Sequence, residues 1–456
     1  MEFAGITFLY YFLPCFLILY YAVPKSWKNP VLLLGSLIFC AWGGPRYLWI
    51  MLLEIAGVYA CGLCIERFRG KIGAKIFLGI SITISIGMLG YFQYADFFIE
   101  NFKRITKLPV ALLHVALPIG IGIYTFQMLG YTIDVYRGVV TAQKNPVTLA
   151  VYAALFPLLP AGPIVRYADV EGQLKSRPQN FACAAQGTKR FLIGLGKQAL
   201  LANELGKLCA AFTASNDKSL LFYWLQAIAF MLWLYYEFSG YSDMAIGLGR
   251  LLGFDFKENF RYPYAAGSIR DFWSRWNISL GSWVREYVYL PLAGNRTSGI
   301  RCVFSVLAAC ALAGFWYGAE WKFLVWGLLS AVLLLLEKLF LGKYLEKARI
   351  WNHIYVLFFV LLGFVLFGTA DMAEAGNYVA AMFGMGKLPV VSQEFFYYLR
   401  SYAVVLVIGA IGATPLLSSA IARVRKNPAA DKLLNVLEIL VLAGCLIVVT
   451  GYLMEG

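Results

Sequence analysis

Residues 270–296 of the chain read RDFWSRWNISLGSWVREYVYLPLAGNR, and residues 313–321, after one apolar segment, read AGFWYGAEW. Charged, aromatic and amide side chains are denser in these two segments than elsewhere in the sequence. Apolar segments long enough to span a lipid bilayer flank the pair on both sides. Because polar groups between membrane spans cost free energy, they usually mark a pathway or a chemical site. We therefore expect the functional site within residues 270–318.

The overall composition indicates a polytopic membrane protein. Of the 456 residues, 61% are hydrophobic and 14% are charged, whereas a soluble domain is about half apolar and about a quarter charged. The first apolar run lacks a basic leader and a small-residue cleavage site, so we expect a retained span and not a signal peptide. No internal repeat, low-complexity tract or soluble domain is visible. Residues 1–456 are therefore predicted to form one membrane domain.

The apolar runs predict an all-α protein with about eleven membrane helices, together with re-entrant or interfacial segments. Runs of spanning length lie near residues 5–23, 46–65, 76–95, 219–238, 320–340, 353–371, 402–422 and 433–452. Shorter or interrupted runs lie at 30–43, 115–134, 146–160 and 300–315.

The net charge of +14 is explained by basic loops that face the cytoplasm and anionic lipid, so no nucleic acid partner is expected. Short basic loops at 67–75 and 423–432 both indicate the cytoplasmic side, but the basic segment 103–107 conflicts with them. The orientation of the termini stays open. The chain has two histidines, His114 and His353, and no paired Cys-x-x-Cys motifs, so no metal site is expected.

Several other segments have more than one interpretation. The runs 118–122 and 157–163, rich in proline and glycine, either line an internal cavity or the interface, or are ordinary helix ends. Segment 177–212 mixes basic and apolar residues, as an amphipathic interfacial helix or a simple anchor would. Asp243 follows an apolar run, and a buried carboxylate needs a partner, for which Arg250 is a candidate.

Residues 250–301 contain eight basic residues, mostly arginine, against four acidic ones. Arginine favours planar, multi-donor contacts with phosphate or carboxylate groups. Asp271 and Arg275 have the i, i+4 spacing of a helical ion pair. Trp273 and Trp276 offer flat surface to a base or a pantetheine-like group. An anionic donor of the nucleotide type, such as acyl-CoA, fits this segment, and anionic lipid head groups fit it equally well.

Together these segments resemble the membrane-bound O-acyltransferase (MBOAT) family, specifically its bacterial branch that O-acetylates alginate and related polysaccharides. The order and spacing of the motifs match from the N-terminus to about residue 330. The motifs are LPIG at 117–120, YTIDVYRG at 131–138, AGPIVR at 161–166, FSGYSDMAIG at 238–247, NF at 259–260, PY at 263–264, FW at 272–273, RW at 275–276 and GNR at 294–296.

The resemblance implies a ring of membrane helices around a central channel, in the bacterial inner membrane. Acyl-CoA, taken to be acetyl-CoA, would deliver the acyl group from the cytoplasm, and no bound cofactor is implied. The acceptor would be an extracellular or cell-wall polysaccharide. The implied partner is an extracytoplasmic acyltransferase or SGNH-hydrolase-like protein, with membrane lipid around the subunit.

Family chemistry centres on two positions. The first is histidine in the alginate branch and asparagine or aspartate in several others; here it is Asn277, whose amide can orient a hydroxyl or a carbonyl. The second is the histidine of a Trp-His-Gly motif, the presumed general base, and here Tyr317 replaces it. A phenol, which titrates near 10, lies roughly 4 kcal/mol from its ionised form at pH 7. The candidate donor- or substrate-binding residues are Arg270, Trp273, Arg275, Trp276, Arg285, Tyr241, Asp243 and Trp316.

Three hypotheses follow. The chain is a pseudoenzyme or scaffold that keeps the channel and the donor site, which we favour slightly because Tyr317 is a poor base. Alternatively, it is an active O-acyltransferase that uses Asn277 and Tyr317, with Glu237, Asp243 or Glu320 as the base. The third hypothesis is a transporter or lipid-binding protein that uses the same cavity.

Overall fold

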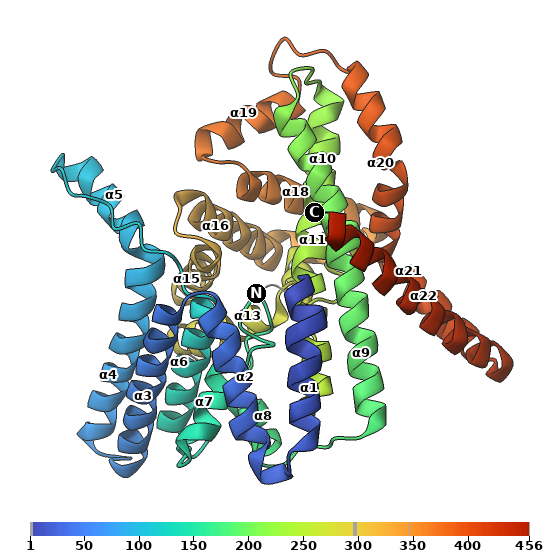
Figure 1. Cartoon of the computed structure of the whole chain (residues 1–456). Coiled ribbons are helices and arrows are strands. Elements are labelled where there is room, and N and C mark those ends of the chain that lie inside the picture. The colour runs from blue at the N-terminus through green and yellow to red at the C-terminus, as the bar shows by residue number, and fades with distance from the viewer. Residues whose placement is uncertain (1–2, 295–298, 346, 456) are drawn as a thin grey trace. The chain divides into compact units, whose positions relative to one another are not determined.

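A computed structural model describes residues 3–294, 299–345 and 347–455, and every regular element in this part of the chain is a helix (Figure 1). Eight helices are long and apolar enough to cross a membrane. They are Pro45–Arg67, Ile72–Thr106, Leu220–Leu251, Ile300–Tyr317, Trp321–Leu345, Ile350–Gly368, Gln393–Gly412 and Pro428–Met454. The all-α membrane class is confirmed, whereas the count of about eleven spans is not.

The chain divides into two compact units. The first comprises Met1–Phe191 and Met244–Lys257, and the second comprises Leu192–Asp243 and Glu258–Gly456. Helices α9 (Phe181–Gly196) and α11 (Leu220–Leu251) each contribute residues to both units. A single membrane domain over the whole chain stays a prediction.

The first unit is a bundle in which α3, α4 and α6 pack against one another, and α2 and α7 pack against α3. Its helices are η1–α1 (Thr7–Ala22), α2 (Lys28–Trp42), α3 (Pro45–Arg67), α4 (Ile72–Leu89), α5 (Ala95–Thr106), α6 (Ile121–Arg137), α7 (Pro146–Ala154) and α8 (Tyr167–Lys175). Local sequence sets several ends. Pro45 opens α3, where a missing N–H costs nothing, and the Asn145 side chain caps α7 at 2.9 Å.

In the first unit, residues 118–120, directly before α6, are buried or half-buried and cross the buried segment after α7, whereas most of residues 107–117 are exposed. Leu155, Phe156 and Leu159 are almost fully buried. Gly120 has φ +75°, and a Cβ atom there would lie 2.8 Å from the Leu159 carbonyl oxygen, so only glycine fits this crossing. The irregular backbone predicted from the proline and glycine runs is therefore packed against protein, which is where a membrane protein tolerates it.

The second unit contains the segment that the sequence singles out. Its helices are η4 (Lys197–Ala202), α10 (Asn203–Ala214), α12 (Ile269–Arg275), α13 (Ile278–Val284), η6 (Arg285–Tyr289), α14 (Leu290–Ala293), α15 (Ile300–Tyr317), α16 (Trp321–Leu336), η7 (Glu337–Leu341), α17 (Gly342–Leu345), α18 (Arg349–Gly368), α19 (Met372–Met382), α20 (Gln393–Gly412), α21 (Leu416–Val424) and α22 (Pro428–Glu455).

Helices α15 and α16 of the second unit pack against each other, and two glycines allow a close approach. A Cβ atom on Gly314 would lie 2.3 Å from the Phe323 carbonyl oxygen. A Cβ atom on Gly327 would lie 2.3 Å from the Cys310 carbonyl oxygen. Such small-residue contacts are how membrane helices reach van der Waals packing in the absence of a hydrophobic driving force.

Some predicted runs differ from the helices. The run at 402–422 is broken, because α20 ends at Gly412 and α21 begins after Pro415. A proline removes a backbone donor and clashes with the preceding turn. The run at 300–315, which we expected to be short, is an 18-residue helix that ends at Tyr317.

Candidate functional site

The backbone around Asn277 is a sharp bend between two short helices. The Ser268 hydroxyl accepts a hydrogen bond from Asp271 N–H at 3.0 Å and so caps the start of α12. Asn277 takes the left-handed conformation, φ 44° and ψ 56°, before α13 begins. The buried Asn259 secures the bend, since its carbonyl accepts from Ile278 N–H and its side chain accepts from Ser279 N–H, at 2.9 and 3.0 Å.

Asn277 and Tyr317 lie in direct contact. The Asn277 amide Nδ2 donates to the Tyr317 phenol oxygen at 2.9 Å, and Trp276 Nε1 donates to the same oxygen at 3.2 Å. Asn277 is 8% exposed and Trp276 is 1% exposed, while Tyr317 is partly exposed at the end of α15. The sequence prediction of a joint Asn277–Tyr317 site therefore has the geometry it requires.

Aromatic rings fix the orientation of Tyr317. Trp326 and Trp316 each pack edge to face with it at a centroid distance of 5.3 Å. Phe367 and Phe238 pack similarly at 5.6 and 6.0 Å. Edge-to-face packing adds orientation to hydrophobic contact, so the phenol oxygen is held toward the two N–H donors.

The chemistry of this site is that of hydrogen-bond donors. The Tyr317 oxygen accepts from two N–H groups, and its own proton has no acceptor among the described residues. Within the same part of the chain, no carboxylate or imidazole contacts this oxygen. The arrangement can hold or polarise an oxygen atom, but it contains no group that takes a proton at neutral pH.

Two of the three carboxylates considered as alternative bases, Asp243 and Glu320, form ion pairs elsewhere. Asp243 forms an ion pair with Lys197 at 2.7 Å, within the second unit. Arg250, the partner we expected for Asp243, instead pairs with Asp255 at 3.4 Å, because Arg250 lies two helical turns further along α11. Glu320 pairs with Lys322 at 3.3 Å.

The remaining predicted residues fall into two groups. Trp316, Trp276 and Trp273 join the aromatic cluster, Trp273 through an edge-to-face contact with Trp326 at 5.3 Å. Tyr241 and Asp243 form no hydrogen bond with Asn277 or Tyr317. Arg285 is exposed and makes no ion pair within the described chain. Residues Asn295 and Arg296 of the GNR motif lie outside the described residues.

Both histidines make local contacts. The His353 Nδ1 atom lies 2.9 Å from the Ala266 carbonyl oxygen. His114 is exposed, and its backbone N–H donates to Asp96 at 2.9 Å. Neither imidazole forms a hydrogen bond with Tyr317.

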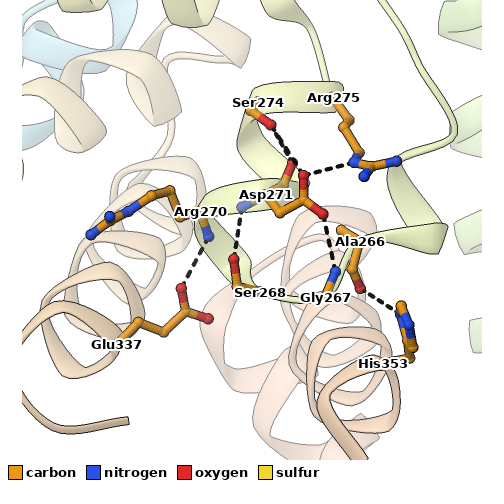
Figure 2. Close-up of polar contacts among 9 residues, drawn as sticks. All are labelled: Ala266, Gly267, Ser268, Arg270, Asp271, Ser274, Arg275, Glu337 and His353. Atoms are coloured by element: carbon orange, nitrogen blue, oxygen red, sulfur yellow. Dashed lines mark hydrogen bonds and ion pairs between the residues drawn. The ribbon is translucent and has the colours of Figure 1, made fainter. Parts of the chain in front are cut away.

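Arg270 and Asp271 lie at a second feature, an open cavity of about 830 Å³. Its lining includes Arg270, Lys338 and Lys343. The Arg270 guanidinium makes no hydrogen bond within the described chain, and Figure 2 shows it extending away from Asp271 and Arg275. The sequence identified Arg270 but missed the two lysines, which close an apolar run more than sixty residues further along.

The acids beside this cavity accept hydrogen bonds from local partners (Figure 2). The Glu337 carboxylate accepts from the backbone N–H groups of Ile269 and Arg270 at 2.5 and 3.1 Å. Asp271 accepts from Arg275 Nε at 2.8 Å, as its i, i+4 spacing predicts, and from Gly267 N–H at 3.1 Å. Partial burial raises the pKa of the Asp271 carboxyl, but these hydrogen bonds outweigh it and hold the pKa below its ordinary value.

Comparison with known proteins identifies the family of the chain. A sequence model of the membrane-bound O-acyltransferase family, MBOAT, matches residues 142–368. A "Probable alginate O-acetylase AlgI" of Azotobacter vinelandii is 35% identical over 423 residues, which are 90% of this chain and 85% of that protein. The protein of the same name from Pseudomonas aeruginosa is 37% identical over 398 residues, covering 85% of this chain and 75% of that protein.

A "Peptidoglycan O-acetyltransferase" of Helicobacter pylori is 29% identical over 415 residues, which are 83% of this chain and 79% of that protein. The chain belongs to the membrane-bound O-acyltransferase family, in the bacterial branch of polysaccharide O-acetyltransferases. It is a multi-pass protein of the bacterial inner membrane.

Proposed function

We propose that this chain is the membrane subunit of a system that transfers an acyl group, taken to be acetyl, to a hydroxyl of an extracellular or cell-wall polysaccharide. The names of its relatives, which include alginate and peptidoglycan O-acetylating proteins, support this substrate class. A partner outside the membrane, an acyltransferase or SGNH-hydrolase-like protein, would complete the transfer.

We further propose that the subunit itself is a pseudoenzyme or scaffold. The observation that carries this proposal is the environment of the Tyr317 oxygen, which accepts hydrogen bonds from Asn277 and Trp276 and has no base beside it among the described residues. Attack by a polysaccharide hydroxyl requires a group that accepts its proton near neutral pH. A phenol with an ordinary pKa near 10 is ionised in only about one molecule in a thousand at pH 7.

The donor in this proposal is acyl-CoA, taken to be acetyl-CoA. The cavity lined by Arg270, Lys338 and Lys343 supports it, because three cations in one lining complement the phosphate groups of a nucleotide-type donor. Trp273 lies on α12, and Trp276 follows the last residue of that helix. Both belong to the second unit.

An active O-acyltransferase is the second candidate, and one observation favours it. The proton of the Tyr317 hydroxyl has no acceptor among the described residues. A phenol in that state can donate a hydrogen bond to the carbonyl oxygen of a bound acyl group, which stabilises the oxyanion that forms during attack. Asn277 would then orient Tyr317, and another group would act as the base.

The test compares O-acetylation of the polysaccharide in cells that carry the wild type, a deletion, Tyr317→Phe or Tyr317→His. The pseudoenzyme proposal predicts that deletion abolishes acetylation, that Tyr317→Phe keeps it, and that purified wild type alone transfers no acyl group. Loss of acetylation in Tyr317→Phe, with normal protein levels, would favour the active enzyme. Transfer that appears only in Tyr317→His would indicate an intact channel that lacks a base.

Binding of acetyl-CoA to the purified protein separates both candidates from a transporter or lipid-binding protein. Isothermal titration with acetyl-CoA is the direct measurement. The acyl-transfer proposals predict saturable binding, and the transporter hypothesis predicts none.

A further inference from the structure

Glu54 is an ionisable group that the acyl-transfer site does not use. It lies within α3 (Pro45–Arg67), one of the membrane-spanning helices, and its exposed fraction is 0%. Within the described chain no lysine or arginine pairs with it. An acid inside a membrane span is costly and is seldom retained without a role.

Hydroxyl groups from two other helices surround the Glu54 carboxyl. Thr125 Oγ1 of α6 donates to Glu54 Oε2 at 3.3 Å. Ser85 of α4 and Tyr124 of α6 lie beside the same carboxyl, and both side chains are buried to 1% exposure or less. Helices α3, α4 and α6 pack against one another in the first unit, as Figure 1 also shows.

The polar atoms of this cluster exceed the partners that the protein supplies. Glu54 Oε1, Ser85 Oγ and the Tyr124 hydroxyl oxygen are buried and have no hydrogen-bond partner in good geometry. Buried polar groups in proteins are nearly always paired, either with protein or with ordered water. Glu54 Oε1 and two hydroxyls from α4 and α6 therefore have fewer partners than they can use, even with Ser85 beside the carboxyl, and a small ligand that both donates and accepts hydrogen bonds fits them.

The charge state of the carboxyl follows from the same surroundings. Tyr124, on α6, is the titratable side chain beside it, and Cys40 of α2 acts on Tyr124 in turn. None of these groups is a cation, so the protein offers no charge to balance a carboxylate. A buried acid without a cation takes the neutral form, because desolvation penalises its anion.

We propose that Glu54, with Ser85 and Tyr124, forms a proton- and water-binding site inside the α3–α4–α6 bundle. Its carboxyl group binds and releases a proton and hydrogen-bonds to bound water. The site exchanges its proton with that water: the carboxyl O–H bond breaks, the electron pair stays on the carboxylate, and the water becomes hydronium; the reverse step restores the acid. This inference concerns the first unit and does not depend on the chemistry at Tyr317.

Infrared difference spectroscopy of the full-length protein in lipid nanodiscs tests the proposal. The spectrum of the wild type minus that of Glu54→Gln, at neutral pH, is expected to contain the C=O stretch of a neutral carboxylic acid. Transfer to D2O is expected to shift this band to lower frequency, because the proton exchanges through bound water. Carboxylate bands in place of the acid band, or an acid band that D2O leaves unchanged, would overturn the proposal.

Glu66→Gln is the matched control, since Glu66 lies on the same helix and is only partly buried. It should leave the acid band unchanged. Glu54→Asp, which keeps the acid, should move the band without removing it, and monodisperse elution of each variant shows that it folds.

Dicyclohexylcarbodiimide, which reacts with protonated carboxyl groups in apolar surroundings, provides an independent readout. Peptide mass spectrometry should locate its adduct on Glu54, and labelling confined to other acids would contradict the proposal.

Discussion

At the scale of single residues, Asn277 combines an unfavourable backbone conformation with a hydrogen bond. Its φ of 44° lies in the left-handed region, which asparagine tolerates better than most residues. The same conformation directs Nδ2 to the Tyr317 oxygen at 2.9 Å. The bend and the side-chain contact therefore depend on one residue.

A double-mutant cycle measures this contact. Asn277→Ala removes the donor and adds backbone strain, and Tyr317→Phe removes the acceptor. The strain occurs both in Asn277→Ala and in the double variant, so it cancels in the cycle. What remains is the interaction energy between Asn277 and Tyr317, which we expect to be about 1 kcal/mol. The measurement is the free energy of unfolding in detergent. Strictly additive effects would show that the hydrogen bond does not stabilise the protein.

Asp271 gives a prediction about pH. Its folded-state pKa is lowered by Arg275 and Gly267, so its contribution to stability is present above the ordinary carboxyl pKa and is lost as pH falls through the lowered value. The melting temperature of the wild type should therefore exceed that of Asp271→Asn at neutral pH. This difference should shrink once the pH falls below about 3.8, the ordinary value.

The matched control for this pH series is Asp255→Asn. Asp255 also pairs with an arginine, but at 3.4 Å and with a side chain that is 71% exposed. Exposed ion pairs stabilise proteins little, so this variant should show no pH-dependent difference. An equal pH dependence in both variants would mean that the Asp271 geometry has no special effect.

At the residue scale, the resemblance to the MBOAT family assigned Asn277 and Tyr317 to one site, and the structure brings the two side chains into contact. The sequence did not identify Trp276 Nε1 as a donor to the same oxygen, since the direction of an indole N–H depends on the bend before α13. Similarly, the need of Asp243 for a partner was predictable. Its identity, Lys197, depends on how two helices far apart in sequence pack.

At the scale of elements, the α15–α16 pair positions Tyr317 and Trp326, which contact each other at 5.3 Å. Tyr317 ends α15, and Trp326 lies in the second turn of α16. The close approach of Gly314 and Gly327 sets the distance between the helices. Small residues in an apolar run are visible in a sequence, but the helix they face is not.

Gly314→Ala tests this packing. The added Cβ atom would lie 2.3 Å from the Phe323 backbone oxygen, which cannot rotate away. We expect a loss of about 1–3 kcal/mol in the free energy of unfolding, the usual effect of overpacking. Gly79→Ala on α4 is the control, because no atom lies within 4 Å of the new Cβ position. Equal stability of the two variants would refute a role for the close glycine contact.

At the scale of the whole molecule, the cavity is built from segments that the sequence separates. Arg270 stands at the start of α12, while Lys338 and Lys343 belong to η7 and α17. Composition already predicted a basic protein, with a net charge of +14. It did not predict that these three cations share one cavity, because the two lysines appear only as the polar end of an apolar span.

The final prediction concerns anion binding at this cavity. Replacing Arg270 and Lys343 with glutamine removes two positive charges that local acids do not neutralise. Each charge contributes at most about 1 kcal/mol at an exposed site, so each substitution should weaken acetyl-CoA binding by up to about fivefold. Arg400→Gln, which alters an exposed arginine of α20 outside the cavity lining, should leave the affinity unchanged. Raising the salt concentration should weaken wild-type binding more than binding to the double variant, because fewer charges remain to be screened. Equal losses in Arg400→Gln and in the cavity variants would mean that net charge, and not this cavity, attracts the donor.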